Sequence, residues 1–231
     1  NQSLAYRGEL FGQIKISVVS TGKYIMPFFL SDFLNQHRGV ELSMDVTNKY
    51  KVVESLEKNQ VDFALVSMMP DQLKLESIEL LDNVLIWITS RELLNAKELS
   101  LEDLKLQNLI FREEGSATRK QMERYIAKHN FVSFKRMELT SNEAVKQSVI
   151  AGLGVSLVPL IGLRNHLERG SIRYISTPDT PIVTRWKLVW LKGKKFSPAS
   201  EQFLKHLELE RDRLIQKHFS WYMDFYHKIN L

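Results

Sequence analysis

The chain has 231 residues, of which 44% are hydrophobic and 26% are charged, a composition typical of soluble globular proteins with one large or two small domains. It contains no cysteine, which excludes disulfides and thiolate chemistry and leaves only His and carboxylates as zinc ligands. The formal net charge of +5 is spread along the sequence, so it is only weak support for an anionic ligand or nearby DNA. No apolar run approaches the roughly 20 residues of a membrane helix, and we expect a cytoplasmic protein.

Strands and helices alternate in the first part of the chain. Apolar patterns predict strands over 14–18, 40–46 and 63–66, with amphipathic helices between them. The first helix is expected to follow Ser20-Thr21-Gly22, to carry Pro27 in its first turn and to end at Gly39. Its expected buried stripe is Phe28, Phe29, Phe33 and Leu34. This β-α-β-α-β order predicts a mostly parallel sheet with helices on both faces.

A second unit with the same alternation is predicted after a strand at 84–88. Ser100 caps a short helix, and further strands are expected over 109–111, 134–139, 155–159 and 172–175. After a last strand at 185–191, Ser197-Pro198 begins a helix by the cap-then-proline pattern. We expect that helix to continue toward the end of the chain, because apolar residues keep helical spacing as far as Ile229.

Two segments of the second unit place small hydroxyl side chains where a helix begins. They are Glu114-Gly115-Ser116-Ala117-Thr118-Arg119 and Thr140-Ser141-Asn142-Glu143. A helix start presents backbone N–H groups without intrahelical partners and a partial positive charge, so it attracts anions. Two such starts in one domain predict a pocket for a small negatively charged molecule, although each hydroxyl taken singly is better explained as a helix cap.

The order of these motifs resembles the effector-binding (regulatory) domain of LysR-type transcriptional regulators. The resemblance runs from about Gly8 to about Leu207. It rests on the Ser/Thr turn followed by Tyr24 and Pro27, VDFALV at 61–66, the loop at 114–119, AVKQSVIAGLGVSLVP at 144–159, and Ser197-Pro198-Ala199 before Phe203. It implies an α/β fold with two Rossmann-like subdomains of periplasmic-binding-protein type II, joined by two crossover strands, with the ligand in the cleft between them.

The resemblance also implies a domain organisation and partners. Residues 8–88 plus 184–231 would form regulatory subdomain I, with 211–231 as an extra C-terminal helix, and 89–183 would form subdomain II. An N-terminal winged helix-turn-helix is absent from this chain, and because the sequence starts at Asn1 without an initiator Met we expect it to be a piece of a longer polypeptide. The implied partners are a small anionic or carboxylate metabolite as effector, further copies of the chain in a homodimer or homotetramer, DNA only through the missing domain, and no membrane.

The candidate effector-binding residues combine the motif matches with the two helix starts. They are Ser20, Thr21 and Ser67 in the first subdomain and Gly115, Ser116, Thr118, Thr140 and Asn142 in the second. One departure from the family pattern is Asn59-Gln60, where the family often has Gly; Asn also adopts the left-handed conformation that such a turn needs. We predict no catalytic residue, no metal ligand and no cofactor.

Other interpretations remain beside this one. A free-standing solute-binding protein of a transporter is the alternative function. An enzyme would need a reactive group in the cleft, and no G-x-S-x-G elbow or zinc helix motif is present. The segment Ala151-Gly152-Leu153-Gly154 lacks the third glycine of a dinucleotide loop and lies between helix and strand, the reverse of that fingerprint. The aromatic tail must be buried, either on its own subdomain or against another subunit.

Overall fold

The computed structural model describes residues 9–93 and 99–229, and the chain divides into two compact units. Unit 1 comprises Asn1–Leu81 and Arg185–Trp221, and unit 2 comprises Asp82–Thr184 and Tyr222–Leu231. The division expected from the sequence, 8–88 plus 184–231 against 89–183, places the first boundary later than Leu81. It also assigns the whole tail to the first subdomain, whereas the tail from Tyr222 onward groups with unit 2. Among the described residues, no helix has both the length and the apolar character needed to cross a membrane.

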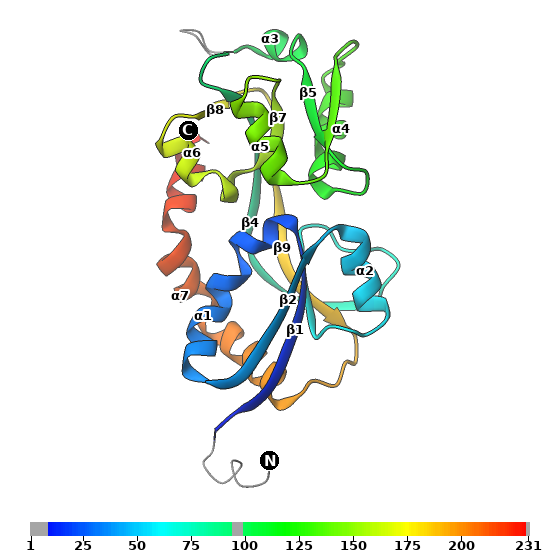
Figure 1. Cartoon of the computed structure of the whole chain (residues 1–231), viewed down its shortest axis with the longest axis vertical. Helices are drawn as coiled ribbons and strands as arrows, with labels where there is room; N and C mark the ends of the chain where they lie inside the picture. Colours follow the sequence, from blue (N-terminus) through cyan, green and yellow to red (C-terminus); the bar gives the residue numbers. More distant parts are fainter. Residues whose placement is uncertain (1–8, 94–98, 230–231) are drawn as a thin grey trace. The chain divides into compact units, whose positions relative to one another are not determined.

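Unit 1 is built on a mixed sheet. Strand β1 (Phe11–Val19) is parallel to both β2 (Gly39–Thr47) and β3 (Phe63–Val66), and β9 (Ile182–Leu191) runs antiparallel beside β3. Helix α2 (Lys49–Glu57) covers one face of this sheet, and α1 (Met26–Gln36) lies on the other (Figure 1). The first part of α7 (Pro198–Ile229) joins α1 there, because Phe203 contacts both Phe33 of α1 and Phe63 of β3. The parallel β-α-β-α-β order expected from the sequence is confirmed.

The expected position of Pro27 in the first turn of α1 is confirmed, although an additional short helix precedes α1. Ser20–Tyr24 form a short 3-10 helix, η2, and the α-helix begins at Met26 with Pro27 in its first turn. Its buried side chains, Met26, Phe29, Leu30 and Phe33, recur at the three- and four-residue spacing of one helix face. The predicted stripe is confirmed for Phe29 and Phe33, whereas Leu34 is only partly buried and Phe28 is 42% exposed.

Gly39 does not end α1, as the sequence suggested. The helix ends at Gln36 with His37 as its C-cap, and Gly39 begins β2. Gly39 is paired with Phe11 across the sheet, and a Cβ added at Gly39 would lie 2.5 Å from the Phe11 ring. Close packing between two strands, and not a helix exit, explains the glycine at this position.

Unit 2 contains two sets of strands. The later part of β4 (Leu75–Ser90) pairs antiparallel with β7 (Ser156–Pro159) and β8 (Ile172–Ile175), and β5 (Leu109–Arg112) pairs parallel with β6 (Arg136–Leu139). A parallel bridge between Leu109 and Val155 links β5 to the chain entering β7. The remaining elements are α3 (Leu101–Lys105), α4 (Ala117–Lys128), α5 (Asn142–Ile150), the 3-10 turn η3 (Leu160–Gly162) and α6 (Arg164–Glu168).

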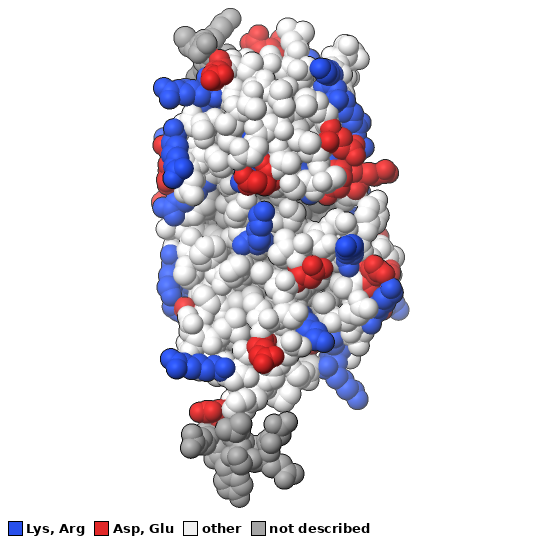
Figure 2. Space-filling model, in the orientation of Figure 1, with Lys and Arg blue, Asp and Glu red and all other residues white. Residues whose placement is uncertain are grey.

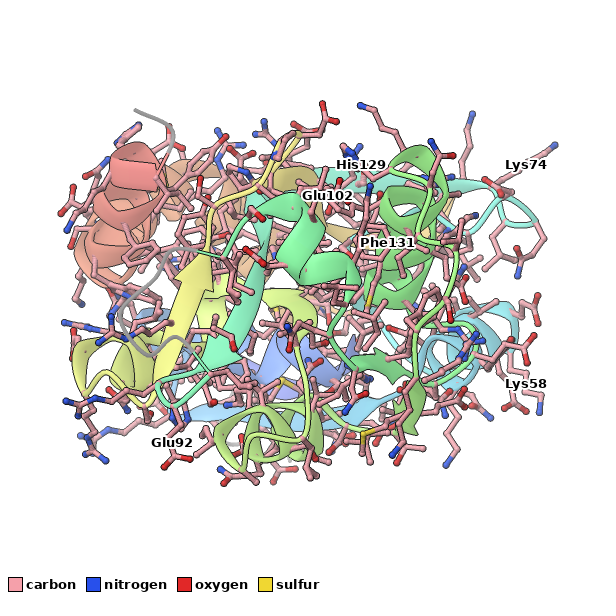
Figure 3. The ribbon with its side chains drawn as sticks, turned by 90° about the horizontal axis from the view of Figure 1, so that it is seen from above. Lys58, Lys74, Glu92, Glu102, His129 and Phe131 are labelled. Carbon is pink, nitrogen blue, oxygen red and sulfur yellow. The ribbon has the colours of Figure 1, made fainter. Side chains whose placement is uncertain are left out.

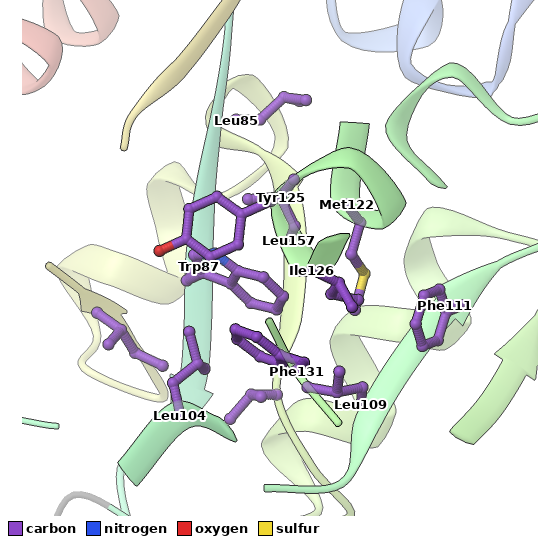
Figure 4. Close-up of a cluster of buried hydrophobic side chains, with 12 residues drawn as sticks. Leu85, Trp87, Leu104, Leu109, Phe111, Met122, Tyr125, Ile126, Phe131 and Leu157 are labelled. Atoms are coloured by element: carbon purple, nitrogen blue, oxygen red, sulfur yellow. The ribbon is translucent and has the colours of Figure 1, made fainter. Parts of the chain in front are cut away.

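The core of unit 2 forms around Trp87 of β4. This side chain is fully buried and lies edge-on to Tyr125 of α4, with ring centroids 5.4 Å apart, and stacked with Phe131 at 6.5 Å. Figure 4 shows these rings surrounded by aliphatic side chains from β4, β5, β7 and α4. Unit 2 therefore has an apolar core of its own.

Candidate functional site

Two helices of unit 2 begin at the same edge of a sheet. Strands β5 and β6 are parallel neighbours whose last residues, Arg112 and Leu139, are paired. A short loop leads from β5 into α4 and from β6 into α5. Because carboxyl ends of parallel strands meet at one edge, the N-terminal amides of both helices and the positive ends of their dipoles come close together.

Each of these helices is capped by a serine. The Ser116 side chain accepts a hydrogen bond from the backbone N–H of Arg119 at 3.5 Å, and the Ser141 side chain accepts one from Ala144 at 3.1 Å. Ser116 therefore has the helix-capping role that the sequence analysis gives as the alternative to ligand binding. In α5 the cap is Ser141, whereas Thr140 precedes the cap and is exposed.

The other candidate residues of unit 2 occupy distinct positions at this edge. Gly115 has φ +82°, a left-handed conformation that favours glycine and turns the loop into α4. Thr118, the second residue of α4, and Asn142, the first residue of α5, are both buried. All five unit 2 candidates therefore lie in or beside the first turns of α4 and α5.

A buried arginine holds the two helix starts, and the sequence prediction did not include it. The Arg112 side chain is only 7% exposed and forms a bidentate ion pair with Glu113, with N–O distances of 2.7 and 2.8 Å. Its Nη1 also donates to Oδ1 of Asn142, while its carbonyl oxygen accepts from Arg119 of α4 at 3.4 Å. Arg112 therefore connects the end of β5 with both helices. A charged residue closing an apolar strand is the only signal that the sequence gives for this role.

The first turn of α5 carries an acid, Glu143, which is paired within the helix. Its carboxylate lies 2.7 Å from Nζ of Lys146 and also accepts from Gln147 at 2.9 Å. Hydrogen bonds from Lys146 and then Gln147 hold the pKa of Glu143 below its ordinary value. The side chain is therefore ionised at neutral pH, and Lys146 compensates its negative charge beside the helix start.

In unit 1, hydroxyl side chains also follow neighbouring strand ends. Ser20 and Thr21 come directly after β1, and Ser67 comes directly after β3, the parallel neighbour of β1. Thr21 is buried, while Ser20 and Ser67 are partly buried. Asn48, which follows β2, caps α2 by accepting from the backbone N–H of Lys51 at 3.0 Å. The three unit 1 candidates thus share one edge of its sheet, at the carboxyl ends where ligands bind in open α/β sheets.

Charged side chains of both signs are interspersed on the face drawn in Figure 2. At the periphery of unit 1, Lys58 and Lys74 point away from the ribbon (Figure 3). Within residues 9–93 and 99–229, no group of three or more His, Asp or Glu side chains is arranged to hold a metal ion. The pair of helix starts in unit 2 is a feature that could attract an anion without a patch of lysine and arginine.

A family model described as the LysR substrate binding domain matches residues 7–210. Among characterised proteins, the chain is 34% identical over 210 residues to the RuBisCO operon transcriptional regulator of Allochromatium vinosum, covering 90% of this chain and 70% of that protein. It is 32% identical over 198 residues to the HTH-type transcriptional activator CmpR of Synechocystis, covering 85% of this chain and 65% of that activator.

Two solved structures show the same fold. The regulatory domain of Synechocystis CcmR, in complex with 2-PG (2-phosphoglycolate), superimposes with a TM-score of 0.79 at 30% identity and covers 87% of this chain and 97% of that domain. The effector binding domain of QuiR, in complex with shikimate, gives a TM-score of 0.76 at 19% identity and covers 88% and 99%. These likenesses confirm the two-subdomain fold of periplasmic-binding-protein type II.

Proposed function

The chain belongs to the LysR substrate binding domain family, and from this premise we propose that it senses a small anionic metabolite for a bacterial LysR-type transcriptional regulator. The relatives named above are regulators, so the proposed role is binding without catalytic turnover. The alternative of a transporter's solute-binding protein has no support among those relatives.

One observation carries the anionic character of the proposed effector. Strands β5 and β6 end side by side, and each leads directly into a helix whose first turn is capped by a serine. Two helix starts at one edge favour a carboxylate or a phosphate over a neutral molecule. The 2-PG in the CcmR domain, a molecule with both groups, gives independent support for an anion.

The proposed contacts are the two sets of residues at the sheet edges. Unit 1 contributes Ser20, Thr21 and Ser67, and unit 2 contributes Gly115, Ser116, Thr118, Thr140 and Asn142. The Ser116 hydroxyl is already used to cap α4. The proposed donors to the effector are therefore the backbone N–H groups of Ser116 and of the residues after it. An effector that contacts both sets favours the arrangement of the units to which it binds more tightly, with a coupling of about 1–3 kcal/mol in typical cases.

The remaining parts of the proposal concern DNA binding, location and assembly. We propose that DNA is bound by an N-terminal winged helix-turn-helix, that the protein works in the cytoplasm, and that it forms dimers or tetramers. Self-association is supported by strand β2, which lies at the edge of the unit 1 sheet and leaves Leu42 and Val46 37% and 42% exposed.

Replacing the exposed Thr140 by aspartate should change anion affinity and folding stability in opposite directions, so the two effects can be told apart. A carboxylate beside the start of α5 is expected to stabilise that helix by about 0.3–1 kcal/mol. The same charge repels an anionic effector, so we expect the Kd for 2-phosphoglycolate to rise at least about tenfold, which corresponds to about 1.4 kcal/mol. Isothermal titration calorimetry measures the affinity, and urea denaturation measures the free energy of unfolding.

The matched control is Thr140→Asn, which has nearly the same shape as aspartate without the charge. Its affinity for 2-phosphoglycolate should stay within about threefold of the unsubstituted chain. Equal affinities in the Asp and Asn variants would exclude Thr140 from the effector site. If the unsubstituted chain bound none of 2-phosphoglycolate, inorganic phosphate and shikimate, the anionic character of the proposed effector would be contradicted.

A further inference from the structure

The C-terminal helix extends well beyond the part of the chain that the family model matches. That match ends at residue 210, whereas α7 continues from Pro198 to Ile229. The helix is interrupted at Phe219, whose backbone angles of φ −122° and ψ 15° are not helical. The helix up to Trp221 belongs to unit 1, and from Tyr222 onward it belongs to unit 2. Besides β4 and β9, α7 is therefore a third segment that passes from one unit to the other.

Before the interruption, α7 is firmly attached to unit 1. Arg213 and Lys217 form ion pairs with Asp32 of α1, with N–O distances of 2.8 and 3.0 Å. Hydrogen bonds from Arg213 and then Lys217 lower the pKa of Asp32 to about 2, so this carboxylate stays ionised near neutral pH. Phe219 itself is buried and stacks on Phe29, with ring centroids 5.6 Å apart.

After the interruption, Tyr222 is fully buried within unit 2. Its hydroxyl donates to the carbonyl oxygen of Asp82 and accepts from the backbone N–H of Val84, both at 2.8 Å. One phenol group thus satisfies two main-chain groups of β4, where the chain has just entered unit 2. Removing only the hydroxyl would leave the buried N–H of Val84 and the part-buried carbonyl of Asp82 without this partner.

A further hydrogen bond links β9, where the chain returns to unit 1, to the same part of β4. Nδ2 of Asn83 donates to Oγ1 of Thr184 at 2.9 Å, and Thr184 is the last residue of unit 2 before the chain returns to unit 1. The three points at which the chain changes units, after Leu81, Thr184 and Trp221, are therefore linked through residues 82–84.

We infer that Tyr222 is a latch that fastens the C-terminal extension to the crossing segments and restrains rearrangement of the two units. The extension from 211 onward is then a part of the hinge. If the chain senses an effector, as the proposed function states, the latch sets how much rearrangement that effector can cause.

The test compares Tyr222→Phe with Tyr226→Phe, the same substitution four residues later on a half-buried side chain. Amide hydrogen exchange at Val84 should become at least tenfold faster in Tyr222→Phe and stay unchanged in Tyr226→Phe. Because the chain has no cysteine, spin labels can be attached to cysteines introduced at exposed Lys51 in unit 1 and Val132 in unit 2. The distance distribution between these labels, measured by electron–electron double resonance without effector, should broaden only in Tyr222→Phe.

A chain ending at Trp221 provides a second variant, since it removes the latch with the rest of the tail, and it should broaden the distribution at least as much. Unchanged distributions in both variants would overturn the proposal. Faster exchange at Val84 with an unchanged distribution would also overturn it, because Tyr222 would then have only a local role. Neither measurement requires an effector, so a failure of the proposed function would leave the result for the latch standing.

Discussion

Arg112→Met is expected to destabilise the protein by about 3 kcal/mol. The substitution leaves Glu113 without its bidentate partner and removes the hydrogen bond from Arg112 to Asn142, and loss of one member of a buried ion pair typically costs about 3–5 kcal/mol. The Glu113 side chain retains 20% exposure, so water can partly solvate it and we expect the lower end of that range. Urea denaturation followed by circular dichroism measures the change in the free energy of unfolding.

The double variant Arg112→Met/Glu113→Gln identifies the cause. Removing both charges eliminates the unpaired carboxylate, so the double variant should regain at least about half of the lost stability. A double variant no more stable than Arg112→Met would contradict an electrostatic cause and would indicate that packing of the arginine side chain dominates. Such an outcome would also weaken the role of Arg112 in holding the starts of α4 and α5.

Trp87→Ala is expected to cost about 3–5 kcal/mol, the usual range for removing a large buried aromatic side chain. Trp87 is fully buried, and it contacts the rings of Tyr125 and Phe131 at the centre of the unit 2 core. A cavity would open between β4 and α4, and the surrounding side chains can fill it only partly. The same denaturation experiment measures this change.

Two comparisons accompany Trp87→Ala. Trp87→Phe should cost clearly less, because it keeps most of the ring and removes an indole N–H that has no hydrogen-bond partner among the described residues. Val132→Ala, at a side chain that is 95% exposed, should change stability by less than about 0.5 kcal/mol. If Trp87→Ala had no greater effect than Val132→Ala, the assignment of Trp87 to the core would be wrong.

Local signals in the sequence predicted most of the secondary structure. Ser100 accepts from the backbone N–H of Asp103 as a helix cap, and Ser197 accepts from that of Ser200 at the start of α7. Asn59 adopts φ +50°, as expected for an asparagine in place of glycine. These features depend on residues a few positions apart, so the sequence contains the information needed to predict them.

The wrong predictions have three different physical causes. Gly39 is a glycine because of Phe11 on the next strand, which no helix-end rule can reveal. Strand β4 begins at Leu75, well before the predicted residue 84. The prediction missed its early part because that part has no continuous apolar run. Phe28 is apolar enough for the core, yet it lies off the helix face formed by Met26, Phe29, Leu30 and Phe33 and is partly exposed.

For the candidate site, the sequence predicted both helix starts of unit 2 but not what holds them. Ser116 was named as a ligand contact, and its hydroxyl caps α4. Arg112 was not named, because its partners Asn142 and Arg119 approach only when β5, α4 and α5 are assembled. Whether the eight named residues contact an effector stays a prediction.

The most direct test of anion binding at the helix starts is a titration of the 15N-labelled chain with 2-phosphoglycolate, observed through backbone amide NMR shifts. Binding at the starts of α4 and α5 predicts saturable shifts that are largest for the amides of Ala117, Thr118, Asn142 and Glu143. Saturable shifts that are largest outside the first turns of both helices would contradict the proposed site.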